Sequence, residues 1–131
     1  MRLGIDLGTT RTVVARADRG NYPVLTFLDP DGDVVEHLPS IVALAGDRLV
    51  HAFEAVVAER EGAPTLRSFK RVLGDPETGL HTTVALGGRT VGLLELLTGY
   101  LEAVRREVLA ALEQEGESDT RLEAVVSVPA H

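Results

Sequence analysis

The residues best suited to chemistry stand near the N-terminus, in the segment Gly4-Ile5-Asp6-Leu7-Gly8-Thr9-Thr10. A carboxylate at the end of an apolar strand, followed by a glycine turn with two hydroxyls, suits a phosphate–magnesium site. Gly8 lets the backbone approach a phosphate closely, and Thr9 and Thr10 add donors to the concavity that turn amides can form. Asp6 could hold Mg²⁺ through its water shell, because Mg²⁺ keeps several waters and needs few protein ligands. The same residues also fit a simple hairpin turn, in which Asp and Thr only satisfy backbone groups.

The second candidate is Lys70, the only lysine among the 13 basic residues of the chain. A lysine ammonium is a compact point charge that reaches a phosphate oxygen or a water molecule, whereas arginine presents a planar fork. The choice of lysine at this one position suits contact with a bound phosphate. The alternative interpretation is that Lys70 belongs to a solvated basic cluster, Arg67-Ser68-Phe69-Lys70-Arg71.

The chain lacks the signatures of several other kinds of site. It has no Gly-x-Gly dinucleotide fingerprint, no Gly-Lys-Ser/Thr phosphate loop and no His-Glu-x-x-His motif. The absence of cysteine excludes disulfides, thiolate metal sites and a cysteine nucleophile. Four histidines are scattered without metal-ligand spacing and are predicted to be structural or surface residues: His37, His51, His81 and His131.

The elements that must position these groups begin with short strands. β-Branched and apolar runs predict strands at residues 3–5, 12–15, 24–28 and 40–44, with Val34-Val35 pairing back across the turn at 29–33. Helical spacing then predicts a short helix around residues 52–57 and a further helical turn from Leu66 to Leu73, stopped at Gly74.

The second half of the chain carries longer elements. Gly87-Gly88 separates two β-like runs, which predicts a hairpin over residues 82–91. Apolar residues recur every three or four positions from Leu93 to Leu112, which predicts a helix of about 20 residues. The run from Leu122 to Val128 is almost unbroken in its apolar character and is typical of a central parallel strand.

Composition limits the class of protein. With 131 residues, 44% apolar and 25% charged, the chain has the size and composition of one globular domain. A formal charge of −7 argues against a broad nucleic-acid or anionic-membrane surface. No apolar run reaches the ~18 residues of a membrane span, and Asp6 interrupts any apolar signal region, so a cytoplasmic protein is predicted. The chain ends directly after a predicted buried strand, which indicates a portion of a longer protein.

Four segments together resemble the seventy-kilodalton heat-shock chaperones of the DnaK type. They are Ile5-Asp6-Leu7-Gly8-Thr9-Thr10, Leu38-Pro39-Ser40-Ile41-Val42-Ala43, Phe69-Lys70-Arg71-Val72-Leu73-Gly74 and Glu123-Ala124-Val125-Val126-Ser127-Val128-Pro129-Ala130. The first is shared with sugar kinases and actin and is weakly specific alone, whereas the set of four in this order is strong. The resemblance runs from end to end of the chain.

The resemblance implies an α/β fold with a ribonuclease-H-like (actin-like ATPase) mixed sheet. In this family two lobes hold ATP in the cleft between them, and residues 1–131 would be the first part of lobe one plus its inserted upper subdomain. The rest of the ATPase domain and the peptide-binding domain would lie beyond His131. The implied function is that of a stress-response chaperone that hydrolyses ATP to gate the binding of unfolded polypeptides, helped by co-chaperones, with no nucleic-acid or membrane partner.

The resemblance also implies roles for individual residues toward ATP or ADP and Mg²⁺. Gly8, Thr9 and Thr10 would wrap the β- and γ-phosphates, and Asp6 would orient Mg²⁺-bound water. Lys70 would be catalytic, positioning the attacking water and neutralising developing charge, as suits phosphoryl transfer. Beyond these five residues, the family's coupling proline, which links nucleotide state to the peptide-binding domain, corresponds to Pro129, whose alternative role is a strand terminator.

The sequence departs from the family pattern at two positions. Arg11 stands where Asn or Tyr is more usual, and His131 stands where an aromatic residue usually follows Pro-Ala. Two related functions stay open at this point, a sugar-kinase-like phosphotransferase and an actin-like filament ATPase. The segment alone is expected to fold but to bind ATP weakly and turn it over negligibly, because the opposing wall of the cleft is missing.

Overall fold

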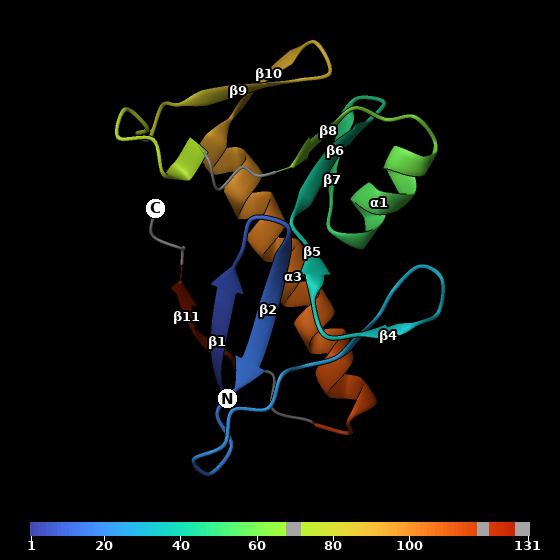
Figure 1. Ribbon diagram of the computed structural model, residues 1–131, viewed down its shortest axis with the longest axis vertical. Helices are drawn as coiled ribbons and strands as arrows, with labels where there is room; N and C mark the ends of the chain where they lie inside the picture. Colours follow the sequence, from blue (N-terminus) through green and yellow to red (C-terminus); the bar gives the residue numbers. More distant parts are fainter. Residues whose placement is uncertain (68–71, 118–120, 128–131) are drawn as a thin grey trace.

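The computed structural model describes residues 1–67, 72–117 and 121–127. Among these residues, the sheet that carries the N-terminal motif has four strands in the order β11-β1-β2-β5 (Figure 1). Strand β11 runs parallel to β1, whereas β1–β2 and β2–β5 are antiparallel, so the sheet is mixed. The strands are β1 (Arg2–Leu7), β2 (Arg11–Arg16), β5 (Leu38–Pro39) and β11 (Glu123–Ser127).

Strand β1 sorts its side chains between the two faces of this sheet, because successive side chains of a strand point to opposite sides. Leu3, Ile5 and Leu7 are buried, whereas the intervening positions, which include Asp6, are exposed. The carboxylate of the first motif therefore lies on the opposite face from the core.

A long helix, α3 (Leu93–Gln114), covers the apolar face of this sheet (Figure 1). The helix is 22 residues long and buries one continuous stripe. The buried residues of this stripe are Leu93, Leu96, Tyr100, Ala103, Val104, Val108 and Leu112. They join the buried side chains of β1 in one apolar cluster, which fixes the helix against the strands.

A second sheet and a short helix pack beside this core. Helix α1 (Phe53–Arg60) buries Ala55 and Ala58 against strand β6. The sheet has the order β7-β6-β8 and is antiparallel, with β6 (Ile41–Ala45), β7 (Arg48–His51) and β8 (Thr65–Arg67).

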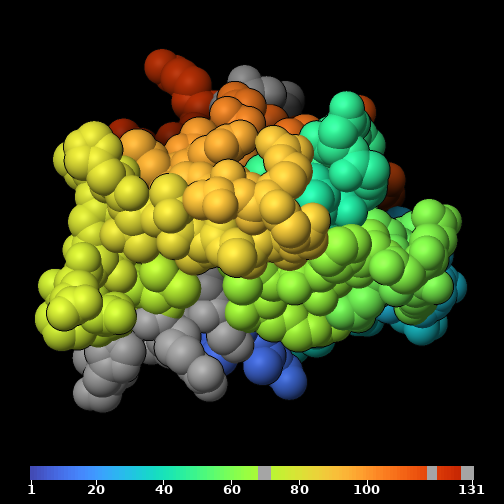
Figure 2. Space-filling model, turned by 90° about the horizontal axis from the view of Figure 1, so that it is seen from above, coloured from blue at the N-terminus to red at the C-terminus, as the bar shows by residue number. Residues whose placement is uncertain are grey.

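Two hairpins complete the described part of the chain: β3 (Phe27–Leu28) with β4 (Val34–Val35), and β9 (Thr83–Leu86) with β10 (Arg89–Gly92). In the view from above, the gold β9–β10 region lies beside the light-green segment that follows α1 (Figure 2). The tip of this hairpin lies against the second sheet, since a Cβ on Gly87 would meet Pro64 and Leu44.

Most predicted elements are confirmed. The α/β class with a mixed sheet, the short helix near residue 52, the hairpin across Gly87-Gly88, the pairing of Val34-Val35 and the long helix all occur. In the described part of the chain, no helix is long and apolar enough to cross a membrane.

Two predicted boundaries are wrong. Leu66 lies in strand β8 and pairs with Val42, because a few apolar residues at helical spacing do not distinguish a helix from a short strand. Only part of the strand predicted at 24–28 forms a ladder. Val24 makes an isolated bridge to Ala15, and Phe27 pairs with β4, so the segment changes partner midway.

The predicted central strand near the C-terminus is parallel to β1, as expected, but it is not central. Strand β11 is the edge of its sheet within the residues described, and all five of its residues are exposed. Val125 is 76% exposed and Val126 41%. An apolar run indicates that a strand favours cover on both faces, but the run does not specify which elements supply that cover.

Candidate phosphate-binding turn and a neighbouring pocket

The candidate phosphate site is the turn that joins β1 to β2. The strands stay in register to the pair Leu7–Thr12, and the Gly8 N–H donates to the Arg11 carbonyl oxygen over 3.0 Å. A Cβ on Gly8 would lie 2.3 Å from that same oxygen. Only glycine fits this close approach of backbone to backbone. Thr9, Thr10 and Arg11 are exposed at the apex.

Asp6 lies beside this turn on the exposed face of the sheet. The Ser127 hydroxyl of β11 lies 3.4 Å from Asp6 Oδ1 and 3.4 Å from the Ile5 carbonyl oxygen, so it can donate to either. Among the described residues, no group of three or more His, Cys, Asp or Glu side chains is placed to hold a metal ion directly. An exposed single carboxylate fits an ion held through water.

Three buried hydroxyls lie at the base of the turn. Thr12 and Tyr100 are 0% exposed, and Ser40 is 2% exposed. The Tyr100 hydroxyl lies 2.9 Å from Thr12 Oγ1 and 3.0 Å from the Pro39 carbonyl oxygen, and Thr12 Oγ1 lies 3.0 Å from Ser40 Oγ. Burial raises the pKa of the Tyr100 phenol, and the hydrogen bonds to Thr12 and Ser40 oppose that rise. We refer to Thr12, Ser40 and Tyr100 as the hydroxyl cluster.

The hydroxyl cluster is joined directly to the turn. The Ser40 backbone N–H donates to the Thr10 carbonyl oxygen over 3.2 Å, so the residue that supplies a buried hydroxyl also holds the apex backbone. Strand β2, the β5–β6 connection and helix α3 each contribute one side chain.

The structure brings together four of the residues predicted for the site: Asp6, Gly8, Thr9 and Thr10. Lys70, the predicted catalytic lysine, lies outside the described residues, as do Pro129 and His131. Residues 123–127 of the last motif are described and form β11 beside β1, whereas Lys70 and Pro129 themselves are not placed relative to the turn.

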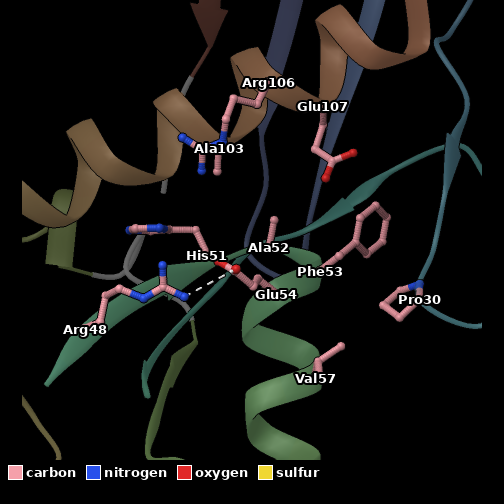
Figure 3. A pocket seen from close by; sticks show the side chains of 10 residues that line it. All are labelled: Pro30, Arg48, His51, Ala52, Phe53, Glu54, Val57, Ala103, Arg106 and Glu107. Atoms are coloured by element: carbon pink, nitrogen blue, oxygen red, sulfur yellow. Dashed lines mark ion pairs between the residues drawn. The ribbon is translucent and has the colours of Figure 1, made fainter. Parts of the chain in front are cut away.

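A second polar region lies on another side of α3, where a pocket of about 560 Å³ separates α3 from the start of α1 (Figure 3). Arg48, His51 and Arg106 lie on one side of it, and Phe53 and Pro30 lie on the other (Figure 3). Its remaining lining residues are Ala52, Glu54, Val57, Ala103 and Glu107. We refer to this as the α1–α3 pocket.

His51 places a buried ring nitrogen in the α1–α3 pocket. Its Nε2 is buried and makes no hydrogen bond to any described residue. The ring packs on α3 where the helix has Gly99, since a Cβ there would lie 2.5 Å from Nε2. Burial lowers the pKa of the His51 imidazole, the Arg106 charge lowers it further, and Glu54 and Glu102 oppose that shift.

Two further residues of this pocket have unusual properties: Glu107 in its pKa and Ala52 in its backbone conformation. Burial raises the pKa of the Glu107 carboxyl, and the neighbouring Arg106 charge opposes that rise. Ala52, which precedes α1, has φ 55° and ψ −126°, a left-handed backbone conformation that favours glycine. No side chain of the described residues caps the helix that begins there.

Sequence reasoning missed the hydroxyl cluster and the burial of His51. One signal for the cluster was present. Thr12 and Val14 are two positions apart in β2 and therefore point to the same, buried face, where a hydroxyl requires a hydrogen-bond partner. Tyr100 occupies the apolar stripe of the long helix, where a phenol likewise requires one. Neither pattern reveals that Thr12 and Tyr100 are hydrogen-bonded to each other.

Comparison with known proteins adds independent evidence. No protein-family profile matches the chain. A protein named "Chaperone protein HscA homolog" from Laribacter hongkongensis is 33% identical over 143 residues, covering 100% of this chain and 22% of that protein. Proteins of the same name from Vibrio campbellii and Shewanella putrefaciens are 42% and 36% identical over 72 and 83 residues. These matches cover 54% and 63% of this chain and 11% and 13% of those proteins.

The chain thus spans about a fifth of the length (22%) of the Laribacter protein, and smaller shares of the other two. The relatives are named as chaperones, in agreement with the family that the four motifs predicted, and the match is consistent with the N-terminal part of such chaperones. The predicted resemblance is therefore confirmed: the chain is a homologue of the seventy-kilodalton heat-shock chaperones.

Proposed function

We propose that this chain is the N-terminal part of the ATPase domain of an ATP-dependent chaperone, a ribonuclease-H-like lobe with its inserted upper subdomain. The complete protein would bind and hydrolyse ATP to gate its hold on unfolded polypeptides, in the cytoplasm and with co-chaperones. The observation that supports this best is the turn after β1, where Gly8 permits a tight backbone bend, Asp6 lies alongside and two threonines lie exposed at the apex.

Each residue of the turn has a separable role in this proposal. The Gly8 N–H is already bonded to Arg11, so Gly8 serves by its lack of a side chain, and the phosphate donors are Thr9 and Thr10. Asp6 holds the water shell of Mg²⁺, which when bound neutralises phosphate charge. Lys70 orients the attacking water and stabilises charge on the terminal phosphate. Pro129 couples nucleotide state to the peptide-binding domain.

The Lys70→Ala variant of the complete protein tests the catalytic part of this proposal. We expect ATP turnover to fall by at least about 100-fold, as on loss of one electrostatic donor, with ATP affinity within about threefold of the wild type. Arg67→Ala is the matched control, because Arg67 already forms an ion pair with Glu59 at 2.6 Å. Turnover that survives in Lys70→Ala would contradict the role given to this lysine.

The same preparations separate the proposed function from its two relatives. A chaperone releases phosphate to solution and holds a labelled unfolded polypeptide with an affinity that depends on the bound nucleotide. Phosphate transferred to a sugar would instead identify a kinase, and ATP-dependent light scattering would identify a filament protein.

A further inference from the structure

We propose that the hydroxyl cluster is a positioning device for the phosphate turn, with Tyr100 as the positioning residue that couples the turn to helix α3. This inference rests on the proposed function, since it assigns the cluster a role in holding the turn against phosphate groups. The hydroxyls do not touch the phosphates. They act through the backbone of the turn.

The connection between cluster and turn is short and entirely polar. Thr12 begins the buried part of β2 two positions after the apex residue Thr10. Ser40 reaches the same apex from the other side, through its N–H bond to the Thr10 carbonyl oxygen. Tyr100 holds both sides, because its hydroxyl lies 2.9 Å from Thr12 Oγ1 and 3.0 Å from the Pro39 carbonyl oxygen.

The cluster is polar at a place where apolar packing would serve stability as well. All three side chains are buried, and Tyr100 belongs to the apolar cluster that includes Leu7, Val14 and Leu38, so its hydroxyl depends on protein groups for hydrogen bonds. Apolar contacts tolerate sliding, whereas a buried hydrogen-bond network specifies one arrangement. The buried hydrogen bonds therefore fix the position of the turn relative to α3, because their distances and angles allow little displacement.

This role predicts an effect on one part of the nucleotide only. The turn is proposed to hold the β- and γ-phosphates, so a displaced turn weakens the binding of ATP and leaves adenosine, which has no phosphate, unaffected. A residue that merely stabilises the fold has no reason to distinguish the two ligands.

Tyr100→Phe is the primary test, and the chain supplies its own control. The substitution removes one hydroxyl and keeps the ring. Tyr22→Phe makes the same chemical change at a tyrosine that is 72% exposed. In the complete protein, with Mg²⁺ present and well below the unfolding temperature, we expect Tyr100→Phe to weaken ATP binding by about three- to tenfold. Adenosine affinity stays within about twofold, and Tyr22→Phe leaves both affinities unchanged.

A second pair of variants guards against a folding defect in Tyr100→Phe. Thr12→Val removes the hydroxyl from the cluster at nearly constant volume, and we expect it to reproduce the selective loss of ATP binding. Thr12→Ser restores a hydroxyl at the same position, and we expect it to recover ATP affinity to within about twofold of the wild type.

Three results would overturn the inference. One is wild-type ATP affinity in both Tyr100→Phe and Thr12→Val. Another is an equal loss of ATP and adenosine binding, which would indicate a purely structural cluster. The third is a wild-type protein that binds no ATP. This result would refute the proposed function and the inference with it, and it is recognised without any variant.

Discussion

Helix α3 contacts two regions that differ in whether their buried polar atoms are hydrogen-bonded. Toward the turn, the Tyr100 hydroxyl is hydrogen-bonded to Thr12 and to the Pro39 carbonyl oxygen. Toward the α1–α3 pocket, the buried Nε2 of His51 has none among the described residues. A satisfied buried network fixes a single geometry, whereas an unsatisfied buried nitrogen only lowers stability. The hydrogen bonds of Tyr100 therefore fix the geometry near the turn, whereas the His51 side of the helix contains a buried nitrogen that no hydrogen bond holds in place.

The largest effect is expected from adding one methyl group at the turn. In Gly8→Ala the new Cβ would lie 2.3 Å from the Arg11 carbonyl oxygen, and backbone must shift to relieve the overlap. We expect the free energy of unfolding to fall by about 1–3 kcal/mol. ATP affinity in the complete protein should fall more than about tenfold, because the exposed apex moves with the backbone.

Gly4→Ala is the matched control for this substitution. Gly4 lies in β1, the strand that leads into the turn, and a Cβ there would have nothing within 4 Å. We expect its unfolding and ATP binding to match the wild type, both measured by the same denaturation and titration experiments. Equal behaviour of the two alanine variants would show that the turn tolerates the displacement.

An intermediate effect is expected from the pocket, in the pH dependence of stability. Because the folded protein lowers the pKa of His51 below its ordinary 6.5, the unfolded state binds more protons as the pH falls through that value. The stabilising contribution is therefore complete above pH 6.5 and is lost toward lower pH, at up to about 1.4 kcal/mol per pH unit.

Chemical denaturation at several pH values between 7.5 and 5 measures this slope. We expect His51→Gln to reduce it, whereas His81→Gln, at an exposed histidine, should retain the wild-type slope. A slope that His51→Gln leaves unaltered would assign the pH dependence to other groups.

The smallest effect is expected at Ala52, whose φ of 55° strains the backbone before α1. Ala52→Gly relieves strain of order 1–3 kcal/mol but loses a buried methyl and gains unfolded-state entropy. We expect a net change within about 1 kcal/mol of zero. Ala55→Gly, at a fully buried position inside the same helix, should cost about 1–2 kcal/mol in the same denaturation assay. A larger loss at Ala52 than at Ala55 would contradict the strain argument.

The N-terminal motif could be read from sequence because its chemistry is local. The glycine, the carboxylate and the two hydroxyls lie within five positions, and their strand–turn–strand setting follows from nearest neighbours. Helix α3 was predictable for a similar reason, since a long amphipathic stripe is a periodic signal. These predictions required no knowledge of which distant segments meet.

The parts that sequence did not predict all depend on distant contacts. The pairing of Leu66 with Val42, the position of β11 at a sheet edge and the meeting of Thr12 with Tyr100 are each set by tertiary packing. His51 was expected to be a structural or surface residue, but the burial of its unpartnered nitrogen against Gly99, a residue far along the chain, could not be predicted.

The position of β11 also bears on how the sheet is assembled during synthesis. Strand β1 pairs with β2 almost at once along the chain, but its other edge waits for β11, in which Glu123 pairs with Arg2. A nascent chain leaving the ribosome therefore carries the hairpin of the N-terminal motif with one open strand edge until nearly all of these residues have been translated. Open edges invite pairing with other chains, and contacts this distant in sequence form slowly. During synthesis, β1 of this chaperone homologue is therefore exposed to incorrect strand pairing until β11 has been translated.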